Sequence, residues 1–302
     1  MMFTVTRRFA IAATLASALL SAPVLAQQLT GTLKKVKDTG VITLGHRESS
    51  IPFSYYDDKQ RVVGYSQEMM LKAVEAVKAE LKLAKLDIKL IPVNSENRIT
   101  LVQNGTVDLE CGSTTNNIER QKQVSFSNSI FIVSTRLMTR KASGIKDFAD
   151  LTGKNVVTTA GTTSERLLRK MNQERMMNMN IISAKDHGEA FLTLETGRAV
   201  AFMMDETLFY GEMAKARTPG DWVVVGTPQS SEAYGCMLRK DDVAFKKVVD
   251  AALAKVMTSG EAEKIYVKWF QQPIPPKGLN LNFALSYANK QLYKAPNDKA
   301  FD

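Results

Sequence analysis

The chain has 302 residues, of which 44% are hydrophobic and 24% are charged, so it is not a largely disordered protein. Its length allows one large domain or two lobes of ordinary size, and its two cysteines are too few for a disulfide scaffold or a four-cysteine zinc site. The net charge is +9, but basic residues alternate with acidic ones and no run of five basic residues occurs. This pattern predicts a solvated mixed-charge surface and no nucleic-acid partner.

The first 26 residues have the three parts of an export signal. Arg7-Arg8 forms a basic start, residues 9–20 form a mostly apolar stretch, and Val24-Leu25-Ala26 offers small residues at a cleavage site. The apolar stretch is too short to cross a bilayer comfortably as a permanent helix, so a signal peptide is favoured over a retained membrane anchor. Removing residues 1–26 removes two arginines and no acidic residue, which leaves a mature net charge of +7. We therefore expect an exported, periplasmic protein of the Gram-negative type.

Export would place both cysteines in an oxidising compartment. Cys111 and Cys236 are the only cysteines in the chain, so no other cysteine competes for either of them. Their separation in sequence does not establish whether their Cα atoms lie close enough to bond. A disulfide between them is therefore a hypothesis at this stage.

Strands and helices alternate along the mature chain. Apolar residues predict strands at 41–44, 86–90 and 107–111. Ser66 is placed to cap a helix whose apolar residues recur at helical spacing, and Ser95 is placed to cap the next helix. This order of strand, helix, strand and helix favours a mostly parallel sheet with helices on both faces.

The middle of the chain repeats the pattern, which predicts a second lobe of the same kind. The elements expected there are strands at 156–159, 181–182 and 200–204 and helices at 163–171 and 187–196. Two further helices are expected at 243–257 and 262–269. The tail beyond about Lys290 is expected to lie over the surface.

Two extended segments look like connections between the lobes. Residues 131–138 form an apolar strand with no nearby glycine, and residues 226–235 look like a loop that returns the chain. We therefore expect an α/β fold of two lobes joined by two extended crossings. The expected boundaries are residues 27–135 with 232–302 for lobe 1 and residues 136–231 for lobe 2.

Common enzyme signatures are absent from the sequence. It contains no GxGxxG, P-loop, HExxH, CxxC or GxSxG motif, and it has only two histidines, so neither a cofactor nor a metal site is expected. Polar clusters instead follow the predicted strands, which is where open α/β sheets bind ligands. These clusters are residues 45–50, 95–98, 112–120, 161–165 and 186–188, together with Asp205.

The clusters offer groups that are complementary to an amino-acid zwitterion. Arg120 follows Thr115 by five residues, so its guanidinium can grip a carboxylate while Thr115 adds donors. The turn at 161–164 precedes a helix and presents free N–H groups, and Asp205 can hold an ammonium. Each group has an alternative role: a Ser or Thr before a helix is commonly only a cap, an Arg near a strand end is commonly on the surface, and Asp205 can cap the following helix.

Four runs of residues carry a resemblance to a known family. The runs are Gly45–Ser50, Glu110–Asn117, Ser183–Gly188 and Glu232–Asp241. With them the chain resembles the bacterial periplasmic amino-acid-binding proteins of ABC importers, and within that family the glutamate/aspartate-binding type, over essentially its whole mature length. The resemblance implies the type II periplasmic-binding-protein fold, in which two lobes joined by two extended crossings close around the ligand.

The resemblance also implies three groups of binding residues. They are Arg120, Thr115 and Thr163 for the α-carboxylate; Asp205 and Ser113 for the α-ammonium; and Arg47, Ser95, Arg98 and His187 for the side-chain carboxylate. Two arginines in a closed cleft are costly unless an anionic ligand neutralises them, which independently favours a dicarboxylate over a neutral ligand. His187 has an alternative role in capping the next helix or supporting the fold.

The function that the resemblance implies is capture of L-glutamate and L-aspartate and their delivery to an inner-membrane ABC permease, by a monomer that does no chemistry. An exported dehydratase-like enzyme on the same scaffold is the alternative from another class, and it would need His187 or Glu48 as a general acid. A ligand-sensing receptor is a further alternative. The sequence does not rank glutamate against aspartate.

Overall fold

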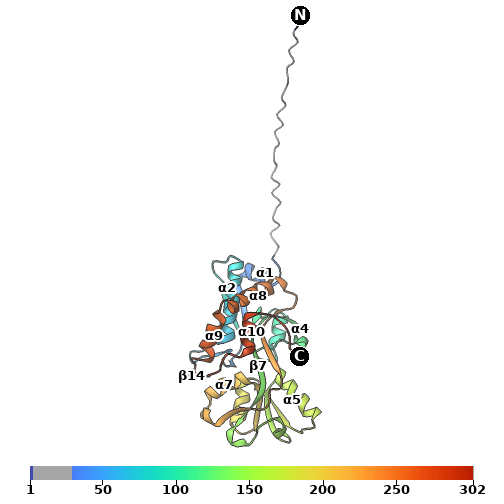
Figure 1. Cartoon of the computed structure of the whole chain (residues 1–302), viewed down its shortest axis with the longest axis vertical. Coiled ribbons are helices and arrows are strands. Elements are labelled where there is room, and N and C mark those ends of the chain that lie inside the picture. The colour runs from blue at the N-terminus through green and yellow to red at the C-terminus, as the bar shows by residue number, and fades with distance from the viewer. Residues whose placement is uncertain (3–28, 302) are drawn as a thin grey trace.

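The computed structural model describes residues 1–2 and 29–301 (Figure 1). The expected signal peptide, residues 1–26, therefore lies almost entirely outside the described residues. Within the part of the chain that is described, no helix has both the length and the apolar character that a membrane crossing requires. The described chain forms two lobes, which lie one above the other in Figure 1.

One nine-stranded sheet extends through both lobes. In spatial order its strands are β5 (Asp87–Pro92), β1 (Val41–His46), β6 (Leu109–Glu110), β12 (Ser231–Arg239), β7 (Val124–Arg140), β10 (Ala201–Asp205), β8 (Asn155–Thr159) and β9 (Asn180–Ala184), with β11 (Trp222–Val225) paired to β7 off this path. The strands β5, β1 and β6 are parallel, and so are β10, β8 and β9. The expected parallel αβ units are therefore present in each lobe.

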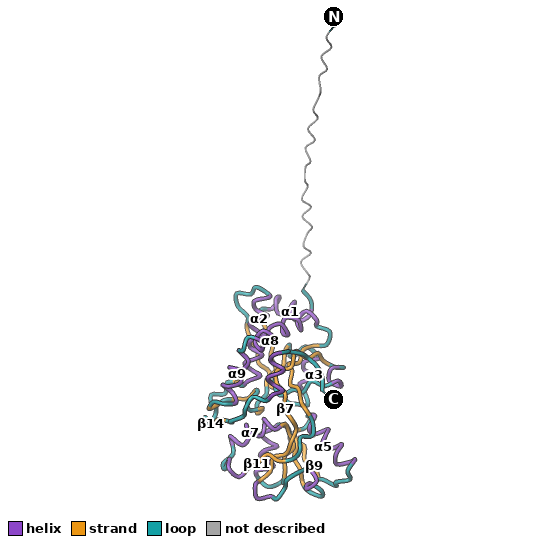
Figure 2. The backbone as a smooth tube through the Cα atoms, in the orientation of Figure 1, coloured by secondary structure: helices purple, strands orange, loops and turns teal. Residues whose placement is uncertain are grey.

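Strand β7 is the axis that joins the lobes. Its first part pairs antiparallel with β12 as far as Ser134, and its second part pairs antiparallel with β10 from Thr135 onward. Figure 2 shows β7 passing from the upper lobe into the lower one. The expected crossing at 131–138 is thus the centre of a strand of 17 residues.

The second crossing differs from the expectation of a loop over residues 226–235. Only its first part is loop, because β12 begins at Ser231 and pairs with β7 from Ser134 back to Val124. The glycine, proline and serines of 226–231 favour a turn locally, but the backbone of β7 offers partners that make the following residues a strand. The predicted α/β architecture of two lobes and two extended crossings is confirmed, with the return crossing in strand form.

Helices cover the faces of both lobes, and short strands complete the chain. The first lobe carries α1 (Gly31–Thr39), α2 (Tyr65–Glu80), α3 (Arg98–Gln103), α4 (Ile118–Gln121), α8 (Val243–Thr258), α9 (Glu261–Phe270) and α10 (Tyr287–Lys294), and the second carries α5 (Thr163–Glu174), α6 (His187–Glu195) and α7 (Glu206–Lys215). The short strands are β2 (Ser49–Ser50), β3 (Ser54–Tyr56), β4 (Val62–Val63), β13 (Pro273–Ile274) and β14 (Leu279–Asn280).

Two helices are not capped by the serines that the sequence analysis proposed. Ser66 lies inside α2, whose N-cap is Gly64, because the carbonyls of Pro52 and Phe53 accept the N–H groups of the first turn and no side-chain cap is needed. The hydroxyl of Ser66 instead donates a hydrogen bond of 2.8 Å to the Gly112 carbonyl. Similarly, α3 has Asn97 rather than Ser95 at its N-cap. Neither serine hydroxyl therefore serves as a helix cap.

The core of the first lobe is aromatic and lies against the crossing strands. Phe131 of β7 is 4.9 Å from Phe53 between ring centroids and 5.2 Å from Phe270, and Tyr234 of β12 is 5.1 Å from Phe53. These four side chains are buried. Edge-to-face and stacked rings of this kind restrict one another's orientation, so both crossings leave the first lobe from a rigid base.

The C-terminal part of the chain is more structured than expected. Residues 287–294 form α10, which Ser286 caps by accepting a hydrogen bond from Asn289 N, and Leu292 and Tyr293 are buried. The prediction of a surface tail from Lys290 was therefore wrong for the helix. Only residues 295–301 follow the surface beyond it.

Candidate functional site

The residues proposed from the sequence come together where the two lobes meet. All are buried, with no more than 9% of the residue surface exposed, and they are Arg47, Ser95, Arg98, Ser113, Thr115, Arg120, Thr163, His187 and Asp205. The first six come from the first lobe and the last three from the second.

Two contacts join the two sets directly, and a third joins Arg120 to the backbone of the second lobe. Arg120 Nη2 donates to the carbonyl of Gly161 at 3.2 Å, Thr115 Oγ1 lies 3.5 Å from Thr163 Oγ1, and Ser113 Oγ lies 3.5 Å from His187 Nε2. Each contact pairs a group of the first lobe with one of the second. The site is therefore built from groups of both lobes.

Arg120 is held in place by the short helix α4. The Asn117 side chain caps this helix by accepting Arg120 N at 2.9 Å, and Arg120 Nη1 donates to the Thr115 carbonyl at 2.9 Å. Burial and the neighbouring Arg98 charge lower the pKa of Arg120 to about 9. Its guanidinium is therefore still protonated at neutral pH and retains donors for a carboxylate.

Arg47 and Arg98 form a second cationic group. Burial and the Arg98 charge lower the pKa of Arg47 to about 10, and burial also lowers the pKa of Arg98. Arg98 Nη1 donates to the Ser113 carbonyl at 3.1 Å and to the Thr114 hydroxyl. Among the described residues, Arg47 Nη1 and Arg98 Nε have no hydrogen-bond partner. Buried guanidinium groups that repel one another and keep unused donors are complementary to an anion.

Glu110 partly compensates this positive charge, a role that the sequence did not reveal. Its fully buried side chain accepts a hydrogen bond of 2.8 Å from Thr114 Oγ1, and its charge favours the protonated forms of Arg47 and Arg98. A Cβ atom on Gly112 would lie 2.6 Å from Glu110 Oε1 and 2.8 Å from Arg47 Cγ. Only glycine therefore leaves room for both side chains at this point.

Asp205 is the acidic residue that the second lobe contributes to the cluster. It accepts hydrogen bonds from Thr135 Oγ1 at 2.8 Å and from the Tyr234 hydroxyl, and its side chain makes no cap bond to α7. Burial and the nearby Glu232 charge raise the pKa of Asp205 to about 7. A buried carboxylate whose ionisation is disfavoured in this way is stabilised by a cation such as an ammonium.

Glu232 and Tyr234 are functional candidates that residue-by-residue reasoning missed. Both lie on β12, and Glu232 Oε2 accepts a hydrogen bond of 2.9 Å from Thr163 Oγ1 of the second lobe. The only sequence signal was the run Glu232–Asp241, which carried the family resemblance without assigning roles. The pairing of β12 with β7 brings both residues beside Asp205.

His187 is held as a neutral imidazole. Burial, followed by the charges of Arg47 and Arg98, lowers the pKa of His187 well below its ordinary value of 6.5. Its Nδ1 lies 2.8 Å from Thr159 Oγ1, and the α6 cap is Asp186, which accepts Glu189 N at 2.9 Å. His187 therefore does not cap the helix, and it offers the junction a neutral ring nitrogen rather than a third positive charge.

The hydroxyls of Ser95 and Thr163 are not consumed by helix caps. Thr162 caps α5 by accepting Glu165 N at 3.0 Å, which leaves Thr163 free to contact Thr115 and Glu232. Ser95 Oγ is buried and has no partner among the described residues. Buried hydroxyls without a protein partner are suited to a polar ligand.

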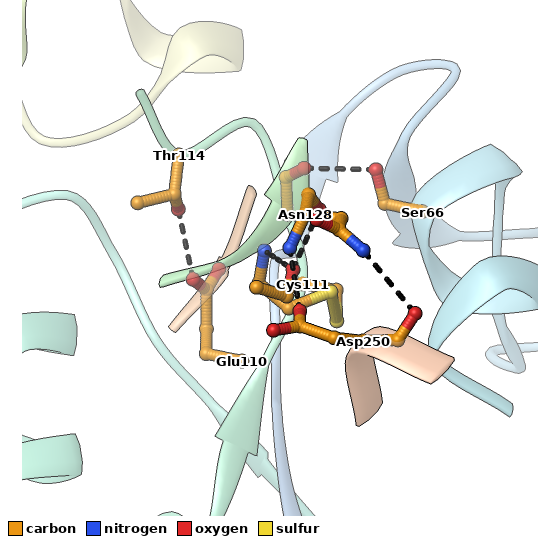
Figure 3. The surroundings of a disulfide bond; sticks show 9 residues. Ser66, Glu110, Cys111, Thr114, Asn128 and Asp250 are labelled. Atoms are coloured by element: carbon orange, nitrogen blue, oxygen red, sulfur yellow. Dashed lines mark hydrogen bonds between the residues drawn. A yellow bond between two sulfur atoms is a disulfide. The ribbon is translucent and has the colours of Figure 1, made fainter. Parts of the chain in front are cut away.

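A disulfide fixes the loop that carries Ser113 and Thr115. Cys111, the residue directly after β6, is bonded to Cys236 of β12, with their Cα atoms 4.3 Å apart. Figure 3 shows Cys111 between Glu110 and Ser66, with the Thr114 to Glu110 hydrogen bond on one side. The bond therefore ties β12 to the first residues of the polar loop.

Three hollows surround this buried cluster at the lobe junction. The largest, about 710 Å³, is lined by residues that include Thr115, Thr163 and Glu232, one of about 220 Å³ includes Arg47, and one of about 400 Å³ includes Arg120. Within the described ranges, no group of three His, Cys, Asp or Glu side chains could hold a metal ion.

Comparisons with known proteins agree with this arrangement. Residues 42–272 match the family of bacterial extracellular solute-binding proteins, family 3. The chain is 66% identical over 285 residues to an L-glutamate/L-aspartate-binding protein of Pseudomonas aeruginosa, with 94% of each chain covered. It is 64% identical over 271 residues to a glutamate/aspartate import solute-binding protein of Escherichia coli, with 90% of each covered.

A solved structure supports the fold. A mutant of the protein ArgBP from T. maritima superposes with a TM-score of 0.70 at 24% identity, covering 79% of this chain and 99% of that one. At this identity the likeness concerns the fold alone, which is that of type II periplasmic binding proteins. By its sequence match and its architecture, the chain belongs to the bacterial extracellular solute-binding proteins of family 3.

Proposed function

We propose that this protein captures L-glutamate and L-aspartate in the periplasm and delivers them to an ABC amino-acid permease in the inner membrane. The observation that carries the proposal is the distribution of buried charge at the lobe junction. Arg98 lies within interaction range of both Arg47 and Arg120, and the buried acids Asp205 and Glu232 lie within range of Arg98 and Arg120 respectively. A dicarboxylic amino acid has the complementary charges: two carboxylates and one ammonium.

The α-amino-acid part of the ligand would occupy the side of the junction near Arg120. Its α-carboxylate would accept bonds from Arg120, Thr115 and Thr163, and its ammonium would pair with Asp205, with Ser113 as a further acceptor. The hydrogen bonds that Asp205 already accepts use part of its capacity, since a carboxylate offers about four acceptor positions. Glu232 adds negative charge beside the same ammonium.

The side-chain carboxylate would lie among Arg47, Arg98, Ser95 and His187. The unused donors Arg47 Nη1 and Arg98 Nε and the unpartnered hydroxyl of Ser95 support this placement. The neutral His187 ring would add a hydrogen bond rather than charge. Two guanidinium groups in this position favour a carboxylate over a carboxamide.

Binding would couple to closure of the two lobes. We propose lobe 1 as residues 27–135 with 232–302 and lobe 2 as residues 136–231, which places both boundaries within the crossing segments. Since each end of the ligand would contact groups of both lobes, the ligand would stabilise their contact. A receptor that closes in this way signals its loaded state to a permease through the relative position of its lobes.

The protein is a solute-binding protein, as its family is, and not an enzyme. The dehydratase alternative would need a general acid at the junction. The pKa of His187 is lowered and Glu48 is exposed, so neither is placed to hold a proton over a leaving group. The proposed receptor works as a monomer after removal of residues 1–26.

Calorimetric titration of the mature protein, stripped of endogenous ligand, tests the proposal. Glutamate, aspartate, glutamine and asparagine would be titrated in parallel, so that each acid is matched with its amide. Saturable one-to-one binding of both acids and much weaker binding of both amides is the expected outcome. Equal binding of acids and amides, or no binding of either acid, would refute the dicarboxylate assignment.

A further inference from the structure

The last described residues form a strap on the surface of the first lobe. Residues 295–301, here called the C-terminal strap, leave α10 and bind three separate parts of the lobe. The Asn297 carbonyl accepts Ser129 N of β7 at 2.8 Å, and Lys246 of α8 lies 2.9 Å from Asp298 Oδ2. The strap also reaches Asn116, where its contacts are most numerous.

Asn116 forms hydrogen bonds with the strap through both its side chain and its backbone. Its Nδ2 donates to the Asp298 carbonyl at 2.9 Å, and its own carbonyl accepts Phe301 N at 3.4 Å. Gln121 Nε2 donates to Asn116 Oδ1 at 2.8 Å and to the Asp298 carbonyl at 3.4 Å. The strap thus holds both ends of residues 116–121 through two side-chain amides.

Two groups of the proposed ligand site lie within residues 116–121 or directly before them. Thr115 immediately precedes Asn116, and Arg120 lies on α4, which has only four residues. A helix of one turn is not stable alone, because it has too few internal hydrogen bonds to offset the ordering of its backbone. Its geometry therefore depends on tethers from outside the segment, and the strap supplies several of them.

The strap is anchored independently of the site. Asn289 of α10 accepts Ile132 N at 2.7 Å and donates to the Ile132 carbonyl at 2.9 Å, so α10 is joined to the crossing strand β7. Leu292 and Tyr293 bury α10 against the lobe. At the far end of the strap, Phe301 lines the hollow of about 710 Å³ together with Thr115 and Thr163.

We infer that the C-terminal strap is a positioning element of the ligand site, which holds Thr115 and Arg120 in the orientation that receives the ligand's α-carboxylate. The inference rests on the proposed function, because it concerns the end of the ligand that those two residues would bind. It predicts a loss that is shared by every α-amino-acid ligand. The preference for acids over amides would be set at the other end of the ligand, by Arg47 and Arg98, and is expected to be unchanged.

A shortened chain that ends at Ala295 tests the inference, because it keeps α10 and its anchors. Titration with glutamate and with aspartate should show affinity reduced about tenfold for both, in keeping with the loss of one or two net hydrogen bonds. The ratio of the two affinities and the glutamate-to-glutamine ratio should stay within a factor of about two. Lys299→Ala, which alters an exposed side chain of the strap, is the matched control and should bind as the unmodified protein does.

A double-mutant comparison separates positioning from a general loss of structure. Asn116→Ala should weaken binding in the full chain, but it should add little in the shortened chain, because the strap that acts through Asn116 is already gone. Fully additive losses, or a shortened chain that binds like the full one, would overturn the inference. If the shortened chain does not fold, Asn116→Ala in the full chain decides, and a loss below twofold counts against the strap.

Failure of the proposed function gives a different result. A full-length protein that binds neither glutamate nor aspartate overturns the proposed function and the strap together. A full-length protein that binds both, with unchanged binding after the shortening, overturns the strap alone.

Discussion

Arg120 of the first lobe donates a hydrogen bond of 3.2 Å to the carbonyl of Gly161, in the turn that begins the second lobe's α5. Gly161 has a positive φ of 72°, and a Cβ atom there would lie 2.9 Å from the Glu96 backbone. The turn therefore docks against the first lobe at two points. Arg120 is placed to bind a ligand and to contact the opposite lobe with the same guanidinium.

Replacing Arg120 by Ala should cost about 2–5 kcal/mol of binding free energy, or roughly 30-fold to several thousand-fold in glutamate affinity. The change would remove the main donor to the α-carboxylate and the contact with Gly161. Titration calorimetry measures the effect. Arg120→Lys keeps the charge but not the planar fork of donors, so its glutamate affinity should lie between that of the unmodified protein and that of Arg120→Ala. A loss smaller than threefold for Arg120→Ala would remove this residue from the site.

The choice of acid over amide is the second prediction. Glutamate should be preferred over glutamine by about 100-fold or more, because a carboxamide would present N–H groups to the donors of Arg47 and Arg98. Arg98→Met should reduce this preference mainly by weakening glutamate, since glutamine gains little from the charge. Competition titrations give both affinities. Glutamine binding within tenfold of glutamate would mean that the distal pocket is not cationic.

Much of the fold and of the candidate site could be predicted from local sequence. The apolar spacing gave the parallel strands and most helices, and the polar clusters that follow the strands contain the nine residues that the family resemblance selected as site candidates. These clusters lie together because strand ends in an α/β sheet converge on one edge, so sequence position implies spatial position. The antiparallel return strand could not be predicted in this way, since its conformation depends on pairing with β7 about a hundred residues earlier.

The missed residues share the same dependence on distant partners. Nothing near Glu110 in the sequence indicates that it lies beside Arg47 and Arg98, and nothing near Asn289 indicates that it pairs with Ile132. Ser66 failed as a cap because carbonyls of residues 52–53 already satisfy the helix. Local sequence indicates which residue can form a contact, whereas the tertiary fold determines which distant residue becomes its partner.

Gly112→Ala is the third prediction. The added methyl group would collide with Glu110 Oε1 and Arg47 Cγ, at 2.6 and 2.8 Å. Overpacking of this kind should lower the free energy of unfolding by about 1–3 kcal/mol and weaken glutamate binding by displacing Arg47. Urea unfolding and titration measure the two effects. Gly220→Ala is the matched control, because a Cβ there meets no atom within 4 Å; equal behaviour of the two variants would contradict the packing argument.

The disulfide supplies the fourth prediction. Cys111 and Cys236 are separated by 125 positions, so the bond should stabilise the fold by up to about 5 kcal/mol on the chain-entropy description. Replacing both cysteines by Ser should lower the free energy of unfolding accordingly in urea titrations. Glutamate affinity should also fall, since the bond fixes the start of the Gly112–Thr115 loop. Full alkylation of the unfolded, unreduced protein purified from the periplasm would show that the bond does not form there.

The pH dependence of binding tests the role of Asp205. Burial and Glu232 raise the pKa of Asp205 to about 7, so the free receptor holds a proton there at lower pH. Pairing with the ligand's ammonium requires the ionised carboxylate, and binding must therefore release that proton. Glutamate affinity should rise by up to about tenfold per pH unit from pH 5 toward pH 7 and then level off.

Stability should respond to Asp205 in the opposite direction. A carboxyl group whose pKa is raised by folding binds its proton more tightly in the native state, so its contribution to the free energy of unfolding falls as pH rises from about 4 to about 7. His187, whose pKa folding lowers, contributes with the reverse sign below about pH 6.5.

Comparing the unmodified protein with Asp205→Asn cancels the His187 contribution. The variant should gain stability relative to the unmodified protein as pH rises through this range, and its remaining glutamate binding should lose the slope below pH 7. An unmodified receptor with flat affinity between pH 5 and 8, or a variant that keeps the slope, would show that Asp205 does not meet the ammonium.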